Sequence, residues 1–89
     1  MPHLLVTHGV QDFARWKALF DADAGGQREA GMRPLQVWRD LDDPQLATFL
    51  IEVADRARAE AFMARPDNAR IGEQAGVRPP FALRWLEPA

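Results

Sequence analysis

Residues 46–53 limit the possible folds of this chain more than any other segment. Their sequence, LATFLIEV, is β-prone and apolar at almost every position, so it predicts a strand with two apolar faces. Both sides of the sheet that contains this strand must then be covered. Helices of the same chain can cover one side, and the other side needs a second cover. We therefore expect a homodimer in which the sheets of two copies pack face to face.

The other elements are predicted from alternation and from helical spacing of apolar residues. Residues 3–9 alternate, with Leu4, Val6 and His8 on one face of the predicted strand. In chain order the predicted elements are a strand at 3–9, a helix between Asp12 and Gly31, strands at 34–41 and 46–53, helices capped by Asp55 and Asp67, and a strand at 81–86. This order, βα, ββ, αβ, predicts an α+β fold.

Residues 1–89 are expected to form a single domain, and its core must be thin. A domain of this size buries only about 60% of the surface that its unfolded chain exposes. The hydrophobic fraction is nevertheless 47%, with three tryptophans and five phenylalanines. Part of this apolar surface is therefore expected to be buried against another chain, which agrees with the predicted homodimer.

The composition excludes several classes of function. The chain has no cysteine, serine or tyrosine, which excludes thiolate chemistry and serine hydrolase triads. The net charge of -2 offers no basic patch for nucleic acid or for an anionic membrane. No apolar run approaches the roughly 20 residues that span a bilayer, and no signal pattern opens the chain, so we expect a cytoplasmic protein.

One run of residues resembles a known group of proteins. Residues 8–17 follow the pattern His-x-Val-x-Asp-Phe-x-x-Trp-Lys, and Gly31, the Asp42-Asp43-Pro44 turn and the Ala75-Gly76-Val77 stretch follow in matching order. The chain thereby resembles small bacterial members of the dimeric α/β-barrel superfamily, which includes cofactor-independent antibiotic-biosynthesis-type monooxygenases and polyketide cyclases. Many members of the superfamily have no assigned activity.

The resemblance implies a ferredoxin-like βαββαβ fold with an antiparallel four-stranded sheet. It further implies a dimeric α/β barrel, with a small pocket in each subunit between the sheet and the helices. Haem-degrading members carry a tryptophan where this chain has Ala54, so we expect no haem and no other cofactor.

His8 and Glu52 are the candidate catalytic residues. His8 lies near the end of the first predicted strand, and Glu52 near the end of the third. We expect the third strand to run parallel to the first and beside it, which would make the two side chains neighbours. Such a pair would supply a general base and the carboxylate that orients it. The alternative is a histidine and an edge carboxylate that never meet.

Four further residues are candidates for substrate binding. Trp16 and Trp38 have flat faces that stack well on conjugated ligands, although Trp16, like Trp85, also fits an apolar packing face. Arg39 and Arg84 lie within predicted strands and need a ligand anion or a carboxylate partner. No metal site is expected, because His3 and His8 face opposite sides of their strand and no other ligand cluster has suitable spacing.

Two functions remain open on these residues. The first is a cofactor-independent monooxygenase or cyclase that acts on a hydrophobic aromatic or polyketide-like small molecule, with His8 as base. The second is a non-catalytic dimeric protein that binds a ligand or has its pocket filled by side chains. Ligand-dependent stabilisation of the folded chain would separate the two.

Overall fold

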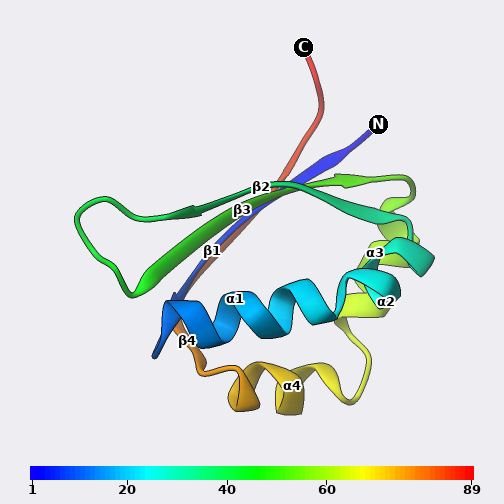
Figure 1. Cartoon of the computed structure of the whole chain (residues 1–89). Helices are drawn as coiled ribbons and strands as arrows, with labels where there is room; N and C mark the ends of the chain where they lie inside the picture. The colour runs from blue at the N-terminus through cyan, green and yellow to red at the C-terminus, as the bar shows by residue number, and fades with distance from the viewer.

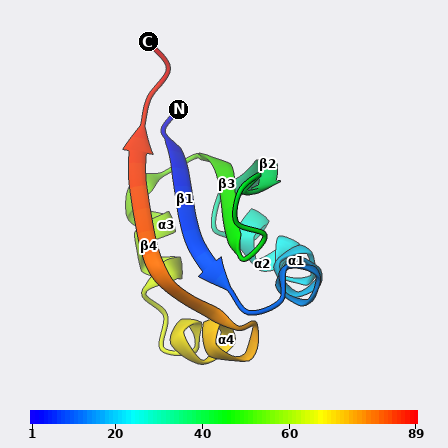
Figure 2. The same cartoon turned by 90° about the vertical axis from the view of Figure 1, so that its left-hand side faces the viewer.

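A computed structural model describes all 89 residues. Its elements are β1 (His3–Val10), α1 (Phe13–Ala22), α2 (Ala24–Glu29), β2 (Met32–Arg39), β3 (Leu46–Val53), α3 (Arg56–Met63), α4 (Asn68–Gln74) and β4 (Val77–Leu86). The strands form one sheet in the order β2-β3-β1-β4 (Figure 1 and Figure 2), and all neighbours are antiparallel. All helices lie on one side of this sheet (Figure 1). The expected ferredoxin-like α+β fold is thereby confirmed.

Strand β3 has the two different faces that its sequence predicts. Ala47, Phe49, Ile51 and Val53 are buried on the side of the helices, whereas the residues between them are only half-buried on the opposite, open face. The alternation of β1 is confirmed in the same way, because Leu4 lies opposite Ile51 of β3 on the buried side. The open face of the sheet has no cover within this chain (Figure 1).

Aspartate side chains cap the N-terminal ends of two helices. Asp12 Oδ1 accepts a hydrogen bond from the backbone N of Arg15 at the start of α1, at 3.1 Å. Asp55 Oδ1 accepts hydrogen bonds from the backbone N of Ala57 and of Arg58 in the first turn of α3. Asp67 precedes α4 as predicted, but its side chain makes no capping hydrogen bond. Gly31 ends the α2 segment with a φ of 76°, a conformation that glycine adopts without the steric cost of a Cβ.

The core is small, as the length of the chain requires. Only 13 of the 89 residues are buried, and ten of these form one apolar cluster between sheet and helices. Trp16 of α1 lies at its centre, with ring centroids 5.0 Å from Phe20 and 5.6 Å from Phe49. None of the helices combines the length and the apolar character needed to cross a bilayer.

The predicted direction of the third strand relative to the first is wrong. β1 and β3 are adjacent but antiparallel, so His8 lies opposite Ala47 and Glu52 lies opposite His3. The helical crossover returns the chain so that β2 runs in the direction of β1, and the β2-β3 hairpin then reverses it. The last strand is also longer than predicted, because it begins at Val77 and carries Pro79 and Pro80 on the edge of the sheet.

Candidate functional site

A cavity of about 290 Å³ lies between the sheet and the helices. Its walls are mostly apolar side chains from β1, β3, β4, α1, α3 and α4. Leu19, Phe81 and Leu83 line the cavity and are also exposed, so they mark its mouth. An apolar, partly enclosed space with a few polar groups is typical of sites that bind small molecules.

His8 is a polar residue within this apolar wall. It comes from the end of β1, is only 7% exposed, and packs edge-on against Trp16 and Phe49 with ring centroids at 5.3 and 5.6 Å. Its Nδ1 lies 3.1 Å from the carbonyl oxygen of Gly9. A carbonyl oxygen only accepts, so Nδ1 carries the proton and donates it. In the neutral ring this leaves a free lone pair on Nε2, the form that a general base requires.

Burial also sets the charge of His8. Desolvation of the ring lowers the pKa of His8 below its ordinary value of 6.5, and the hydrogen bond to Gly9 opposes this shift by a smaller amount. The imidazole is therefore neutral at pH 7. A neutral base in an apolar cavity can take a proton from a weakly acidic group of a bound molecule.

The expected pairing of His8 with Glu52 is not present in the structure. Because β1 and β3 are antiparallel, Glu52 lies at the opposite end of the sheet from His8, and it is on the open face. Its Oε1 accepts a hydrogen bond from Nη2 of Arg33 at 3.2 Å. The Gly9 carbonyl, and not a carboxylate, fixes the orientation of His8.

The tryptophans occupy three different environments. Trp16 is buried and lines the cavity beside His8, so its ring is available to a ligand as a wall. Trp38 lies on the open face of the sheet, opposite Thr48, and is 46% exposed. Trp85 is half-buried on the helix side, under the guanidinium of Arg56 at 4.8 Å. Trp38 therefore does not belong to the cavity.

Arg39 and Arg84 also lie outside the cavity. Both are exposed, and neither forms an ion pair within the chain. Arg39 lies at the end of β2, with its guanidinium carbon 5.7 Å from the ring centroid of Phe13. Arg84 lies opposite Leu5, on the open face of the sheet. Within this chain neither arginine has the carboxylate partner expected as one alternative from the sequence, and a partner from a ligand or a second chain stays a prediction.

Three polar residues of the cavity, Asp23, Gln27 and Asn68, were not singled out from the sequence. Asp23 and Gln27 lie at the junction of α1 and α2 and line the cavity. The side chain of Gln27 is buried, and its Oε1 has no hydrogen-bond partner. The sequence signal for Asp23 and Gln27 is weak, because Gly25 and Gly26 obscure the helical pattern around both residues.

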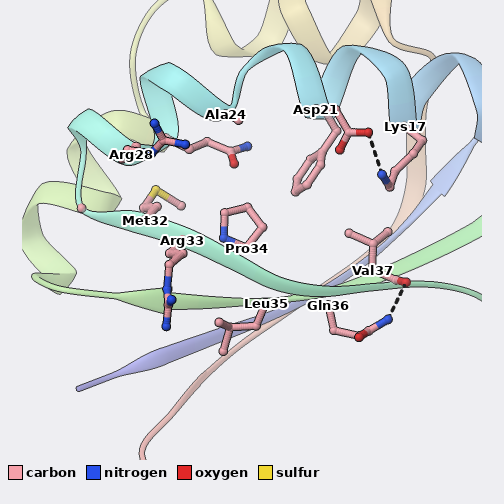
Figure 3. Close-up of a pocket in the computed structure, with 13 residues that line it drawn as sticks. Lys17, Asp21, Ala24, Arg28, Met32, Arg33, Pro34, Leu35, Gln36 and Val37 are labelled. Atoms are coloured by element: carbon pink, nitrogen blue, oxygen red, sulfur yellow. Dashed lines mark hydrogen bonds and ion pairs between the residues drawn. The ribbon is translucent and has the colours of Figure 1, made fainter.

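An open groove of about 800 Å³ lies on the other side of Gln27, between the α1-α2 segment and β2 (Figure 3). Lys17, Arg28 and Arg33 bring positive charge to it, and Lys17 Nζ binds Asp21 Oδ2 at 2.7 Å. The groove and the inner cavity share three lining residues: Phe20, Gln27 and Met32. The two spaces therefore adjoin at these side chains.

The His, Asp and Glu side chains do not gather into a group of three that is suited to hold a metal ion. Their separation follows from the placements above, since His3 and His8 point to opposite faces of β1 and Glu52 pairs with Arg33. The titratable chemistry of the cavity is therefore that of His8 and Asp23.

Comparison with known proteins shows what the fold resembles. No family model and no curated protein matches the sequence. A proposed antibiotic biosynthesis monooxygenase from Bordetella bronchiseptica superposes with a TM-score of 0.79 at 14% identity, covering 99% of this chain and 96% of the other. A protein of the same description from Deinococcus radiodurans gives 0.71 at 17% identity, with 100% and 93% covered.

A third structure carries a different description. It is an uncharacterised NIPSNAP domain protein from Burkholderia xenovorans, with a TM-score of 0.70 at 14% identity, covering 100% of this chain and 95% of the other. Identities this low demonstrate a shared fold and leave the reaction open. The chain therefore has, over its whole length, the ferredoxin-like fold of structures described as antibiotic biosynthesis monooxygenases.

Proposed function

We propose that this protein binds a hydrophobic aromatic or polyketide-like small molecule between sheet and helices and acts on it as a cofactor-independent monooxygenase or cyclase. The proposal is based on the burial of His8 and on the hydrogen bond that leaves its Nε2 unprotonated. It is buried beside aromatic rings, its Nδ1–H is held by the Gly9 carbonyl, and its Nε2 is left as a base in the cavity wall. The likeness in fold to proposed antibiotic biosynthesis monooxygenases supports the same class of reaction.

The first chemical step is the same for both reactions. His8 Nε2 removes a proton from a phenol or from a carbon next to a carbonyl group, and the substrate becomes an electron-rich anion. Trp16 and Phe49 hold the flat substrate beside the imidazole, because their rings already pack against it. The lowered pKa of His8 keeps the base form populated at pH 7 and somewhat below.

We also propose a homodimer formed through the open faces of two sheets. The central strands place Leu5 and Leu50 opposite each other on this face, and Trp38 and Leu86 are exposed on its outer strands. Arg84 and Glu52 add charges of both signs on the same face. A self-complementary patch of this composition fits a two-fold symmetric interface.

A matched pair of histidine variants tests the role of His8. 2-Hydroxyanthraquinone serves as the binding probe and is followed by tryptophan fluorescence. Anthrone serves as the turnover substrate: His8 removes a proton from its methylene carbon, O2 oxidises the resulting anion to anthraquinone with release of water, and oxygen uptake and product analysis follow the reaction. We expect His8→Asn to retain binding but to lower turnover by at least ~100-fold, the usual contribution of a positioned base. His3→Asn, on the open face and outside the cavity, should change neither quantity.

Three results would contradict the proposal, one for ligand binding, one for catalysis and one for the role of His8. If the wild type binds no aromatic or quinone probe, the cavity is filled by its own side chains. If it binds the probe without turnover, the protein is a ligand-binding module. Equal turnover by wild type and His8→Asn would exclude His8 as the base.

A further inference from the structure

We propose that Gln27, together with Asp23, recognises a hydroxyl group at the end of the ligand farthest from His8. This inference rests on the proposed function and specifies its substrate class: an elongated aromatic compound with hydrogen-bond donors at both ends. It assigns a specificity-determining role to two side chains that the reaction itself does not use.

The unpaired oxygen of Gln27 is the observation that requires explanation. Gln27 is 6% exposed, and its Oε1 is buried without any hydrogen-bond partner. A buried acceptor without a partner destabilises a fold by about 1–3 kcal/mol, and such groups are rare. A glutamine that only filled space would be replaced by an apolar side chain at no loss. The position is therefore better explained by a partner that arrives with the ligand.

Asp23 provides a second acceptor at the same end of the cavity. Its Oδ2 accepts a hydrogen bond from Nη2 of Arg65 at 3.2 Å, and its Oδ1 accepts none from the chain. The guanidinium of Arg65 is held in turn against the ring of Phe62, 3.8 Å from its centroid. Asp23 and Gln27 are four residues apart, and Gln27 N donates to the Asp23 carbonyl at 3.0 Å, so both side chains lie on one helical face.

These two acceptors select the chemistry of the ligand. A hydroxyl group can donate to either oxygen and accept from Gln27 Nε2 or from Arg65 Nε, which is buried without a partner beside Asp23. A carboxylate would place its negative charge against that of Asp23. The ligand group is therefore a phenol or an alcohol and not an acid. The positive side chains of the outer groove do not change this choice, because Lys17, Arg28 and Arg33 are not among the residues that line the inner cavity.

The spacing along α1 gives the length of the ligand. Trp16 contacts His8, and Asp23 lies seven residues further along the helix, which is about 10 Å at 1.5 Å per residue. A three-ring scaffold with hydroxyl groups at both ends spans a distance of this order. One hydroxyl then lies beside His8, and the other reaches Gln27 and Asp23.

The test compares two probes that differ by one hydroxyl, 2-hydroxyanthraquinone and 2,6-dihydroxyanthraquinone. Their dissociation constants are measured by tryptophan fluorescence for the wild type, for Gln27→Met and for the control Gln74→Met, an exposed glutamine of α4 outside the cavity. We expect the wild type and the control to bind the dihydroxy compound about tenfold more tightly, and Gln27→Met to lose this preference. Anthraquinone-2-carboxylate should bind no better than the monohydroxy compound to any of the three.

A second measurement separates recognition from a structural role. Methionine has a similar shape and a good helix propensity but leaves no acceptor unpaired, so Gln27→Met should keep or raise the melting temperature of the free protein. A lower melting temperature would make Gln27 a structural residue and overturn the inference. Equal affinity of the wild type for both hydroxylated probes would also overturn it and leave the proposed function intact, whereas failure to bind either probe would contradict the proposed function itself.

Discussion

The buried imidazole of His8 couples the stability of the fold to pH. Burial lowers the pKa of His8 in the folded chain, while the unfolded chain keeps the ordinary value of 6.5. Below pH 6.5 His8 therefore becomes protonated in the unfolded chain, whereas in the folded chain it stays neutral down to the lowered pKa. The free energy of unfolding therefore has its full value above pH 6.5 with respect to His8, and it decreases as the pH falls from 6.5 towards the lowered pKa.

This linkage predicts a difference between wild type and His8→Asn. Between about pH 8 and about pH 5, the melting temperature of the wild type should fall more steeply than that of the variant, which has no group to protonate at this position. The carboxylates titrate equally in both proteins, so the difference between the two curves isolates His8. Parallel curves would show that the ring is not desolvated.

The positions and partners of individual site residues were harder to predict from the sequence than the helices and strands that carry them. His8 and Trp16 follow from strand alternation and helical spacing, which place both on the buried side, although their chemical roles stay predictions. Glu52 could not be placed, because its distance from His8 depends on the direction of β3, which no local pattern records. Gln27 was missed because burial without a partner is a property of the packed molecule and not of the sequence.

At the scale of elements, the helix starts can be tested by two aspartates in equivalent positions. Asp55 accepts hydrogen bonds from Ala57 N at 2.9 Å and from Arg58 N at 3.3 Å, whereas Asp67 makes no capping bond. Asp55→Ala should lower the free energy of unfolding by ~1 kcal/mol, measured by urea denaturation. Asp67→Ala should change it by less than ~0.5 kcal/mol, since its only ion pair, with Arg70, is exposed. Equal losses would contradict the assigned caps.

Helices and strands could be predicted where neighbouring residues alone define them, as an apolar run, an N-cap or a C-cap glycine does. Residues 46–53 form a strand with the predicted bounds, and Asp12 and Gly31 mark helix ends as expected. The predicted last strand begins four residues after the start of β4, because Pro79 and Pro80 indicate the end of a strand. An edge strand tolerates proline on its unpaired side, and β4 is at the edge, which only the complete sheet order reveals.

At the scale of the whole molecule, the thin core and the open sheet face belong together. A chain with 13 buried residues has little apolar burial to stabilise it alone. The half-buried side chains on the open face of β3, such as Leu46 and Leu50, offer further apolar area. A second copy on this face would complete the core that one chain lacks, as the apolar run at 46–53 already predicts.

The dimer can be tested at the centre of that face. Leu50 lies opposite Leu5 of β1 and Gln36 of β2, so Leu50→Asp would place an unpaired charge within the interface. We expect light scattering to give a dimer for the wild type and a monomer for Leu50→Asp, with association weakened at least ~100-fold, which is ~2.7 kcal/mol. Leu41→Asp is the control, because Leu41 is 99% exposed in the loop between β2 and β3 and should leave the dimer unchanged. A monomeric wild type, or a Leu50→Asp variant that still pairs, would mean that the open face is not the interface.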